Sequence, residues 1–310
     1  EAVAQGIADK FDALRDMETN VFGYESNRIL KYTGPSTIEL VDMAGDDRYV
    51  TGTMINIVVF DMEAGLCGYF WSKDYYDTNG IEISEDNSIL NYSNKGKCFY
   101  VNSDLVLGKF GTLYTTLVHE YQHMIDFNRK DILSNIESKA FYNEMLSMLS
   151  EDIMAVKLKE LCGDTYDYYK DGPFGYLKYC NDLYYEYGLT DWDNNGALTY
   201  GTVYTFGAWL CRQYGGAALV QKMSKNNKVD IASIEDAAGK DIVTLLGQYT
   251  QALVFKNASD TKYSLNKAAA GTLVYHSGQS DEYSYPMKAI DLWSQVVEAA
   301  GTGPVAFGAS

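Results

Sequence analysis

The sequence predicts an α+β fold with two lobes, in which strands come first and helices follow. Between Thr37 and about residue 101, β-branched and aromatic runs alternate with Gly and Asp turns. From Gly111 to about residue 255, apolar residues recur with the helical period instead. This order is typical of α+β chains. It places a boundary near residue 130, between a strand-containing lobe (1–130) and a mainly helical lobe (131–310).

The N-terminal lobe is expected to open with a helix and continue as a sheet. Ile7, Phe11 and Leu14 recur at helical spacing within residues 1–20. The runs that follow have the composition of strands. The expected strands cover residues 38–41, 54–60, 68–71 and 98–101.

The C-terminal lobe is expected to consist mainly of helices. A Ser134-x-x-Glu137 capping box predicts a helix from about Ser134 to Leu161, reached by a short turn at 130–133. A further helix over 201–214 ends at Gly215, a residue type that favours helix C-termini. From about residue 257 the chain is loop-rich, with a strand expected near 272–275.

Composition excludes several classes of function. The formal net charge of -17 comes from 42 acidic and 25 basic residues, which disfavours nucleic acid and anionic membranes as partners. No run of 18 apolar residues predicts a transmembrane segment. The five cysteines include no Cys-x-x-Cys pair, which argues against a structural zinc knuckle. Because the chain begins at Glu1, we expect that a leader has been removed.

The most informative motif is the run HEYQH at residues 119–123, on a helix expected to begin after Gly111. His119 and His123 lie four residues apart, so both imidazoles project from one helix face and can bind one tetrahedral ion. Glu120 lies beside them and is the candidate general base. Two of the three histidines in the chain occupy this motif, which predicts a catalytic zinc site.

A catalytic zinc needs a third protein ligand, for which His276, a cysteine or a carboxylate on the next helix are candidates. Glu144 follows Asn143 on that helix, and this spacing resembles the glutamate-ligand zinc peptidases typified by thermolysin. Glu151 lies two turns further along the same face. It is the first candidate to orient a metal-bound histidine, and Asp152 is the second.

Longer segments resemble the hyicolysin family of neutral metalloproteases. The resemblance rests on HEYQHMI from residue 119, NEMLSMLSEDI from Asn143, and YGTVYTF from Tyr200, and it covers about residues 50–255. It implies a secreted or cell-surface bacterial zinc endopeptidase of the zincin fold. Such a fold has a twisted mixed sheet, an active-site helix and a glutamate as third zinc ligand.

A tyrosine is expected to stabilise the oxyanion. The pattern Tyr204-Thr-Phe-Gly-Ala resembles alanine-aminopeptidase-like families, in which the equivalent tyrosine binds the developing oxyanion; Tyr200 is the alternative. The Gly-x-Met-Glu-Asn strand that anchors a free amine in those families does not occur before His119. A peptide or protein cleaved at internal bonds is therefore the expected substrate. A zinc aminopeptidase and a non-catalytic surface binding protein are the alternatives.

Two further expectations concern the substrate and calcium. The substrate is expected to add as a strand to a sheet edge, for which residues 98–101 are the candidate. The segment DWDNNG from Asp191 resembles the start of a calcium-binding loop, with Asp191, Asp193 and Asn195 as oxygen ligands. Its twelfth position is Thr202 rather than Glu, so the motif is incomplete.

Overall fold

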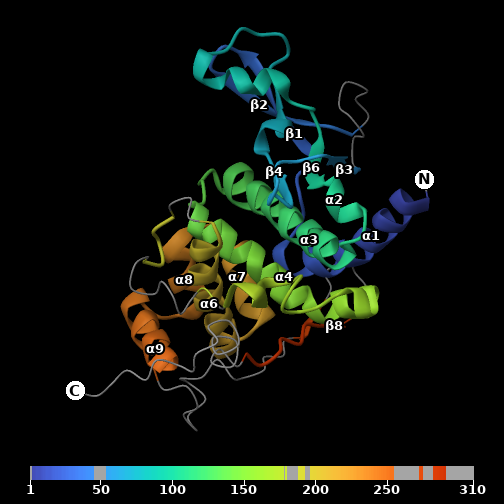
Figure 1. The fold of residues 1–310 in the computed structure, drawn as a ribbon. Coiled ribbons are helices and arrows are strands. Elements are labelled where there is room, and N and C mark those ends of the chain that lie inside the picture. The colour runs from blue at the N-terminus through green and yellow to red at the C-terminus, as the bar shows by residue number, and fades with distance from the viewer. Residues whose placement is uncertain are drawn as a thin grey trace.

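The computed structural model shows a body of helices from which the strand-rich part projects (Figure 1). It describes residues 2–44, 54–177, 179, 188–192, 196–254, 272–274 and 282–290, and all structural statements refer to these. The α+β class predicted from the sequence is confirmed, since strands precede most of the helices. The described α-helices are α1 (Ala2–Phe22), α2 (Ser103–Val106), α3 (Phe110–Asp126), α4 (Ala140–Cys162), α6 (Ala197–Tyr214), α7 (Ala217–Lys225), α8 (Asp230–Ala238) and α9 (Ile242–Val254).

The strands form three small sheets. One has the order β2-β1-β5, a second β3-β6-β4, and β7 pairs with β8. The described strands are β1 (Arg28–Gly34), β2 (Thr37–Asp42), β3 (Ile55–Phe60), β4 (Gly68–Phe70), β5 (Tyr76–Asp77), β6 (Lys97–Asn102), β7 (Thr272–Val274) and β8 (Glu282–Ser284). Of these, β1, β5 and β8 were not predicted; in β1 the apolar residues are few and are interrupted by Lys31.

The position of β6 corrects one prediction. Residues 98–101 lie within β6, which pairs with β3 in parallel and with β4 in antiparallel orientation. Both of its edges are therefore occupied, so it cannot accept a substrate strand. Both β4 and β6 contact the active-site helix, and β4 pairs only with β6 among the described strands.

Helix α3 lies between the sheet β3-β6-β4 and the remaining helices (Figure 1). Its apolar side chains Leu113, Leu117 and Tyr121 are fully buried, as the helical period predicts. One continuous core joins residues as distant as Phe99 in β6 and Trp209 in α6. The division of the chain near residue 130 stays a prediction.

The connection from α3 to α4 differs from the predicted short turn. Helix α3 continues into a π-helical segment, η3 (Phe127–Ile132), and α4 begins only at Ala140. Ser134 does not cap α4: its hydroxyl donates to the backbone carbonyl of Arg129 at 2.9 Å. The capping-box prediction was therefore wrong, because most of the predicted turn at 130–133 belongs to the π-helical extension of α3.

Two basic side chains of η3 fasten the active-site helix to the helical body. The buried Lys130 ammonium donates to the carbonyls of Met223, Asn226 and Lys228 at 2.7–2.8 Å. Arg129 donates to the carbonyl of Lys225 at 3.0 Å. Burial lowers the pKa of Lys130 to about 8, with the charge of Asp126 acting in the opposite direction.

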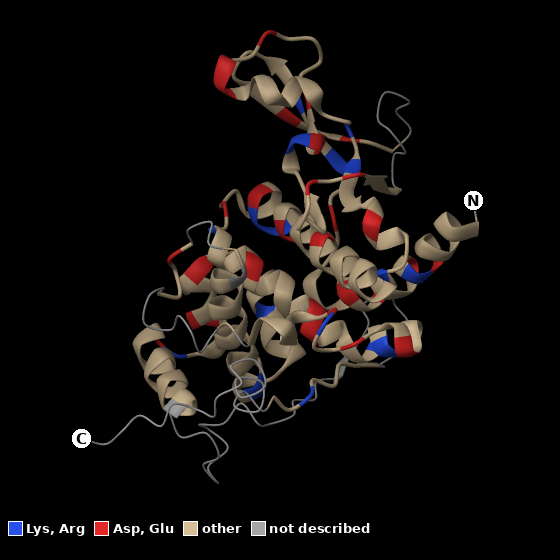
Figure 2. Ribbon diagram, viewed as in Figure 1, with Lys and Arg blue, Asp and Glu red and all other residues tan. Residues whose placement is uncertain are grey.

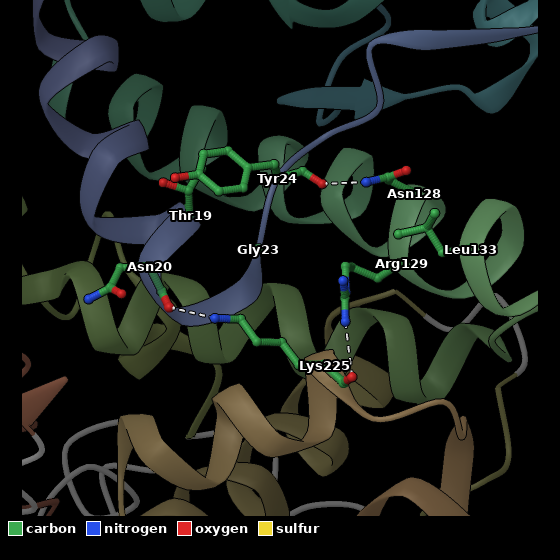
Figure 3. A pocket seen from close by; sticks show the side chains of 8 residues that line it. All are labelled: Thr19, Asn20, Gly23, Tyr24, Asn128, Arg129, Leu133 and Lys225. Carbon is green, nitrogen blue, oxygen red and sulfur yellow. Dashed lines mark hydrogen bonds between the residues drawn. The ribbon is translucent and has the colours of Figure 1, made fainter. Parts of the chain in front are cut away.

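A small pocket of about 310 Å³ lies at this junction of α1, η3 and α7 (Figure 3). Its two cations are directed at helix C-terminal carbonyls, since Lys225 donates to Asn20 and Arg129 to Lys225. Positive charge at a helix C-terminus is favourable, so these contacts stabilise the packing of α1, η3 and α7 around the pocket.

Charged residues are spread over the sheet part and the helical part alike (Figure 2). None of the described helices combines the length and apolar content that crossing a membrane requires.

Candidate metal centre

The two motif histidines project from one face of α3, as their spacing predicts. The ring centroids of His119 and His123 are 4.8 Å apart, and each side chain is mostly buried, with 14% and 13% exposed. The α3 residues on either side of the two histidines along the helix are largely buried apolar residues. The rings are therefore held in a partly enclosed cleft.

Glu144 of α4 completes the cluster. Its Oε2 atom lies 3.1 Å from His119 Nε2 and 3.6 Å from His123 Nε2. One ligand atom from each of the three residues lies within 4.8 Å of the others. Helix α4 packs along α3 and so brings this carboxylate to the histidine face. Two imidazole nitrogens and one carboxylate oxygen match the donor set of catalytic zinc sites.

The outer nitrogen of each imidazole is already engaged. His119 Nδ1 donates to Glu151 Oε1 at 2.6 Å, and His123 Nδ1 donates to Asn143 Oδ1 at 2.8 Å. These contacts leave Nε2 of each ring directed at Glu144, and an outer nitrogen held by a carboxylate or carbonyl is usual for metal-ligating histidines. Glu151 was predicted for this position. The role of Asn143 was missed, although its place next to Glu144 was visible in the sequence.

The electrostatics of Glu144 suit a ligand. Burial alone would raise its pKa, but the charge of His123 and hydrogen bonds from both histidines outweigh it and hold the pKa well below the usual range. The group is thus an ionised carboxylate facing two nitrogens, which is the state a cation requires.

Glu120 lies on the same turn, 6% exposed, beside the cluster. Burial raises its pKa above the ordinary value, while the nearby histidines and a hydrogen bond from the Phe70 backbone act in the opposite direction. The side chain lines the larger of two pockets that meet at the cluster. A carboxylate in such a place can exchange a proton with a bound molecule.

The two pockets together form the cleft. The larger, of about 510 Å³, contains His119, Glu120 and Glu151, and the smaller, of about 290 Å³, contains His123 and Glu144. Residues 65–68, just before and at the start of β4, line the larger pocket, and Phe70 at the end of β4 lines the smaller. The cleft therefore follows β4 past the three candidate ligands.

Tyr204 and Asp152 are not in this cleft, which corrects both predictions. Tyr204 is fully buried, and its hydroxyl donates to Asp152 Oδ2 at 3.1 Å. The Asp152 carboxylate also accepts two hydrogen bonds from Arg212, at 2.8 and 3.0 Å. Asp152 thus neutralises a buried arginine instead of orienting a histidine. Tyr204 supplies a further hydrogen bond to the Asp152 carboxylate.

Replacing Arg212 with Leu is expected to destabilise the protein by about 3–5 kcal/mol, because Asp152 would remain as an uncompensated buried charge. Urea unfolding measures the change. Lys222→Leu, which also removes one positive charge but at an exposed site on α7, is the control and should cost less than about 0.5 kcal/mol. Equal losses for the two variants would refute the buried-pair explanation.

Tyr200 is the tyrosine that faces the cluster. It lines the larger pocket, its ring centroid is 6.5 Å from that of His119, and its hydroxyl hydrogen-bonds with Glu144. Tyr176 lines the same pocket and packs against Tyr200, with ring centroids 5.6 Å apart. Nothing in the sequence singles out Tyr176 among 27 tyrosines.

The remaining candidates are the residues expected to bind calcium and His276, the alternative third zinc ligand. Asp193, Asn195 and His276 lie outside the described residues. Asp191 Oδ2 accepts from the backbone N–H of Gly188 at 3.0 Å, and the Asp191 N–H donates back to the Gly188 carbonyl at 3.1 Å. The Asp191 side chain thus closes a tight turn with Gly188, and this geometry gives calcium no support.

Comparison with known proteins agrees with the donor set. Residues 11–305 match the model of the peptidase M30 family. The chain is 24% identical over 176 residues to the neutral metalloprotease ShpI of Staphylococcus hyicus, covering 51% of this chain and 35% of that protein. The matched part thus spans about a third of the length of this relative. The family match covers nearly the whole chain, and the chain therefore belongs to the peptidase M30 family.

Proposed function

We propose that this protein is a zinc-dependent endopeptidase that hydrolyses internal peptide bonds. The observation that carries the proposal is the convergence of His119 Nε2, His123 Nε2 and Glu144 Oε2 beside Glu120. Membership of a peptidase family and similarity to a neutral metalloprotease support it.

The three convergent side chains are the proposed zinc ligands, and Glu151 and Asn143 keep the imidazoles oriented. A zinc ion held there would polarise the scissile carbonyl and lower the pKa of a water molecule toward about 7. Glu120 would accept the proton of the attacking water and later deliver it to the leaving amine nitrogen. Its hydrogen bond from the Phe70 backbone holds the carboxylate in place for this transfer.

Tyr200 is the proposed hydrogen-bond donor to the oxyanion that forms during attack. Burial raises its pKa, and the charges of Glu144 and Glu120 raise it further, so the phenol keeps its proton and can donate it. Its place in the pocket with His119 and Glu120 supports this role.

Tyr200→Phe is expected to lower kcat by about 10²–10³, because one oxyanion donor would be lost. Tyr204→Phe is the matched control. It removes one hydrogen bond to Asp152, costs about 1 kcal/mol of stability and leaves kcat near the parent value. Steady-state kinetics on one peptide compare the two. If Tyr204→Phe lost activity and Tyr200→Phe kept it, the assignment would be reversed.

The proposed substrate path runs along β4, which has no second partner strand among those described. An extended peptide could pair with this edge and lie across Glu120 and the histidines. Residues 65–71, which line this path, include no acidic residue that could anchor a free amine. The β4 side of the cleft therefore offers no carboxylate to a free amine, which is in keeping with internal cleavage.

The test uses an internally quenched peptide with blocked ends and an amino-acid amide, each with and without a chelator. The proposal expects cleavage of the blocked peptide only, loss of activity with the chelator, and recovery with zinc. Cleavage of the amide alone would show an aminopeptidase. Bound zinc without cleavage of either would show a binding protein that retains the site.

Secretion or display at a cell surface is part of the proposal. It is supported by the resemblance of the motif segments to secreted neutral metalloproteases and by the acidic net charge of -17. Immunodetection of the native protein in the culture medium, the cell-surface fraction and the cell lysate tests it. Detection in the lysate alone would contradict it.

A further inference from the structure

We infer that the pocket beside His123 selects substrates with a lysine or arginine side chain next to the scissile bond. The inference rests on the proposed function, because it assumes that a peptide lies along β4 past the metal ligands. It names one residue class of that peptide and the two carboxylates that recognise it, Asp131 and Glu137.

The pocket opens directly on the metal cluster. It has a volume of about 290 Å³, near the lower end of the range for pockets that hold small ligands, and so has room for a single long side chain. Three parts of the chain form it: the end of β4, the helix α3 with its extension η3, and the segment that leads into α4. Its lining residues are Phe70, Trp71, Ser72, His123, Phe127, Asp131, Glu137, Ser138, Asn143 and Glu144.

Three aromatic side chains form part of the pocket wall. The rings of Phe70 and Phe127 lie 6.0 Å apart, and Trp71 adjoins them with 41% of its surface exposed. Lysine and arginine carry three or four methylene groups between backbone and charge, and these stems pack well on apolar surface while the charged end reaches a polar rim. The aromatic wall thus fits the stem of a basic side chain.

Two carboxylates of the pocket have no Lys or Arg partner in the described part of the chain. Asp131 and Glu137 form no ion pair among the described residues, and the lining contains neither Lys nor Arg. The adjacent Lys130 ammonium is buried and bound to the carbonyls of Met223, Asn226 and Lys228. A cation from outside the described chain is therefore the natural counterpart.

A third carboxylate lies behind this rim. Asp126 is fully buried, its Oδ2 accepts from Ser138 of the lining, and its Oδ1 has no hydrogen-bond partner among the described residues. Burial raises the pKa of Asp131 to about 7, and the neighbouring charges of Asp126 and Glu137 add to it. A bound ammonium or guanidinium group would relieve this repulsion and leave the carboxylates ionised.

The pocket on the other side of the cluster differs in charge. It contains Lys170 and Asp171, and Lys170 lies 3.7 Å from Asp167 while Asp171 accepts from Thr112 at 2.7 Å. Acid and base are both present there and both have partners. The preference for a cation is therefore expected at one position of the substrate and not on both sides of the cleaved bond.

The test is a set of internally quenched peptides that are identical except for Arg, Lys, Gln or Glu at each position flanking the cleaved bond. At one position the parent protein, loaded with zinc, is expected to cleave the Arg or Lys peptide with a kcat/KM about tenfold above that of the Gln peptide. Charge-assisted hydrogen bonds of a partly enclosed pair are of this order. Mass spectrometry of the products confirms that the bond cleaved stays the same.

The variants Glu137→Gln and Asp131→Asn/Glu137→Gln should both reduce this ratio, and the double variant should bring it to within about twofold. Glu137→Lys should reverse the order of the Arg and Glu peptides. Glu82→Gln, which removes one exposed negative charge that lines neither pocket of the cleft, controls for net charge and should keep the parent ratio. Because Glu137 is exposed, its single variants keep the test valid if the double variant does not fold.

Equal kcat/KM for Arg, Lys and Gln at every position of the parent would overturn the inference, as would an unchanged ratio in a folded Asp131→Asn/Glu137→Gln variant. Failure of the proposed function looks different. In that case the zinc-loaded parent cleaves none of the peptides, whatever residue they carry.

Discussion

Glu120→Gln is expected to lower kcat for peptide hydrolysis by about 10²–10⁴, because an amide cannot accept the proton of the attacking water. Gln has nearly the same shape, so the hydrogen bond from the Phe70 backbone can be kept and the fold left intact. KM should change little, since the peptide still pairs with β4. Initial rates on a blocked peptide measure the loss.

The control for this variant is its zinc content. Glu120 is not among the three convergent ligands, so the metal should remain at one ion per chain. If the zinc-loaded Glu120→Gln variant hydrolysed the peptide at the parent rate, Glu120 would not be the base, and the proposed mechanism would be wrong.

Glu144→Ala is expected to abolish activity by removing the third ligand. Catalytic zinc sites use three protein ligands and keep one open position, and this variant would retain only two of the three. Affinity for zinc should fall by more than the 10–100-fold that changes in outer partners of ligating histidines typically cost. Competition with a chelating dye measures the affinity, and added zinc should not restore activity at micromolar concentration.

Glu151→Gln is the matched comparison, because it changes a carboxylate one step further from the metal. Its side chain contacts His119 Nδ1 at 2.6 Å, so its loss should weaken zinc binding by about 10–100-fold and be partly rescued by excess zinc. Equal zinc affinities for Glu144→Ala and the parent would rule out Glu144 as a ligand.

The parts of the site that could be predicted from the sequence are those set by local periodicity. The i, i+4 spacing of the histidines fixes their common face on any helix. The position of Glu144 required only that the next helix pack back on α3, which short connections favour. The actual connection is longer and partly π-helical, yet α4 still packs along α3 and presents the same face.

The choice of tyrosine could not be made from the sequence, because it depends on packing between distant segments. Tyr200 and Tyr204 lie one turn apart on α6, and the motif resemblance favoured the second. The structure shows why this was wrong: Arg212, two turns beyond Tyr204, enters the core and binds Asp152. Arg212 in a largely apolar helix was a visible sign of a buried ion pair. The sequence did not indicate that its partner would be Asp152 on α4.

The order of the strands in the sheet likewise could not be predicted from the sequence. The run at 98–101 is the most apolar of the predicted strands near the metal helix, and its full burial follows from a central position. The short β4 contributes only Gly68–Phe70, yet it forms the accessible side of the cleft. Apolar content thus indicated the centre of the sheet and not its edge.

A crystal structure of the zinc-loaded protein, with anomalous scattering recorded at the zinc edge, tests the proposed metal site. We expect one strong peak about 2.0–2.2 Å from His119 Nε2, His123 Nε2 and a Glu144 oxygen, with Glu120 nearby but not bound. A peak at any other cluster, or a fully active crystal batch with no peak between these three side chains, would contradict it.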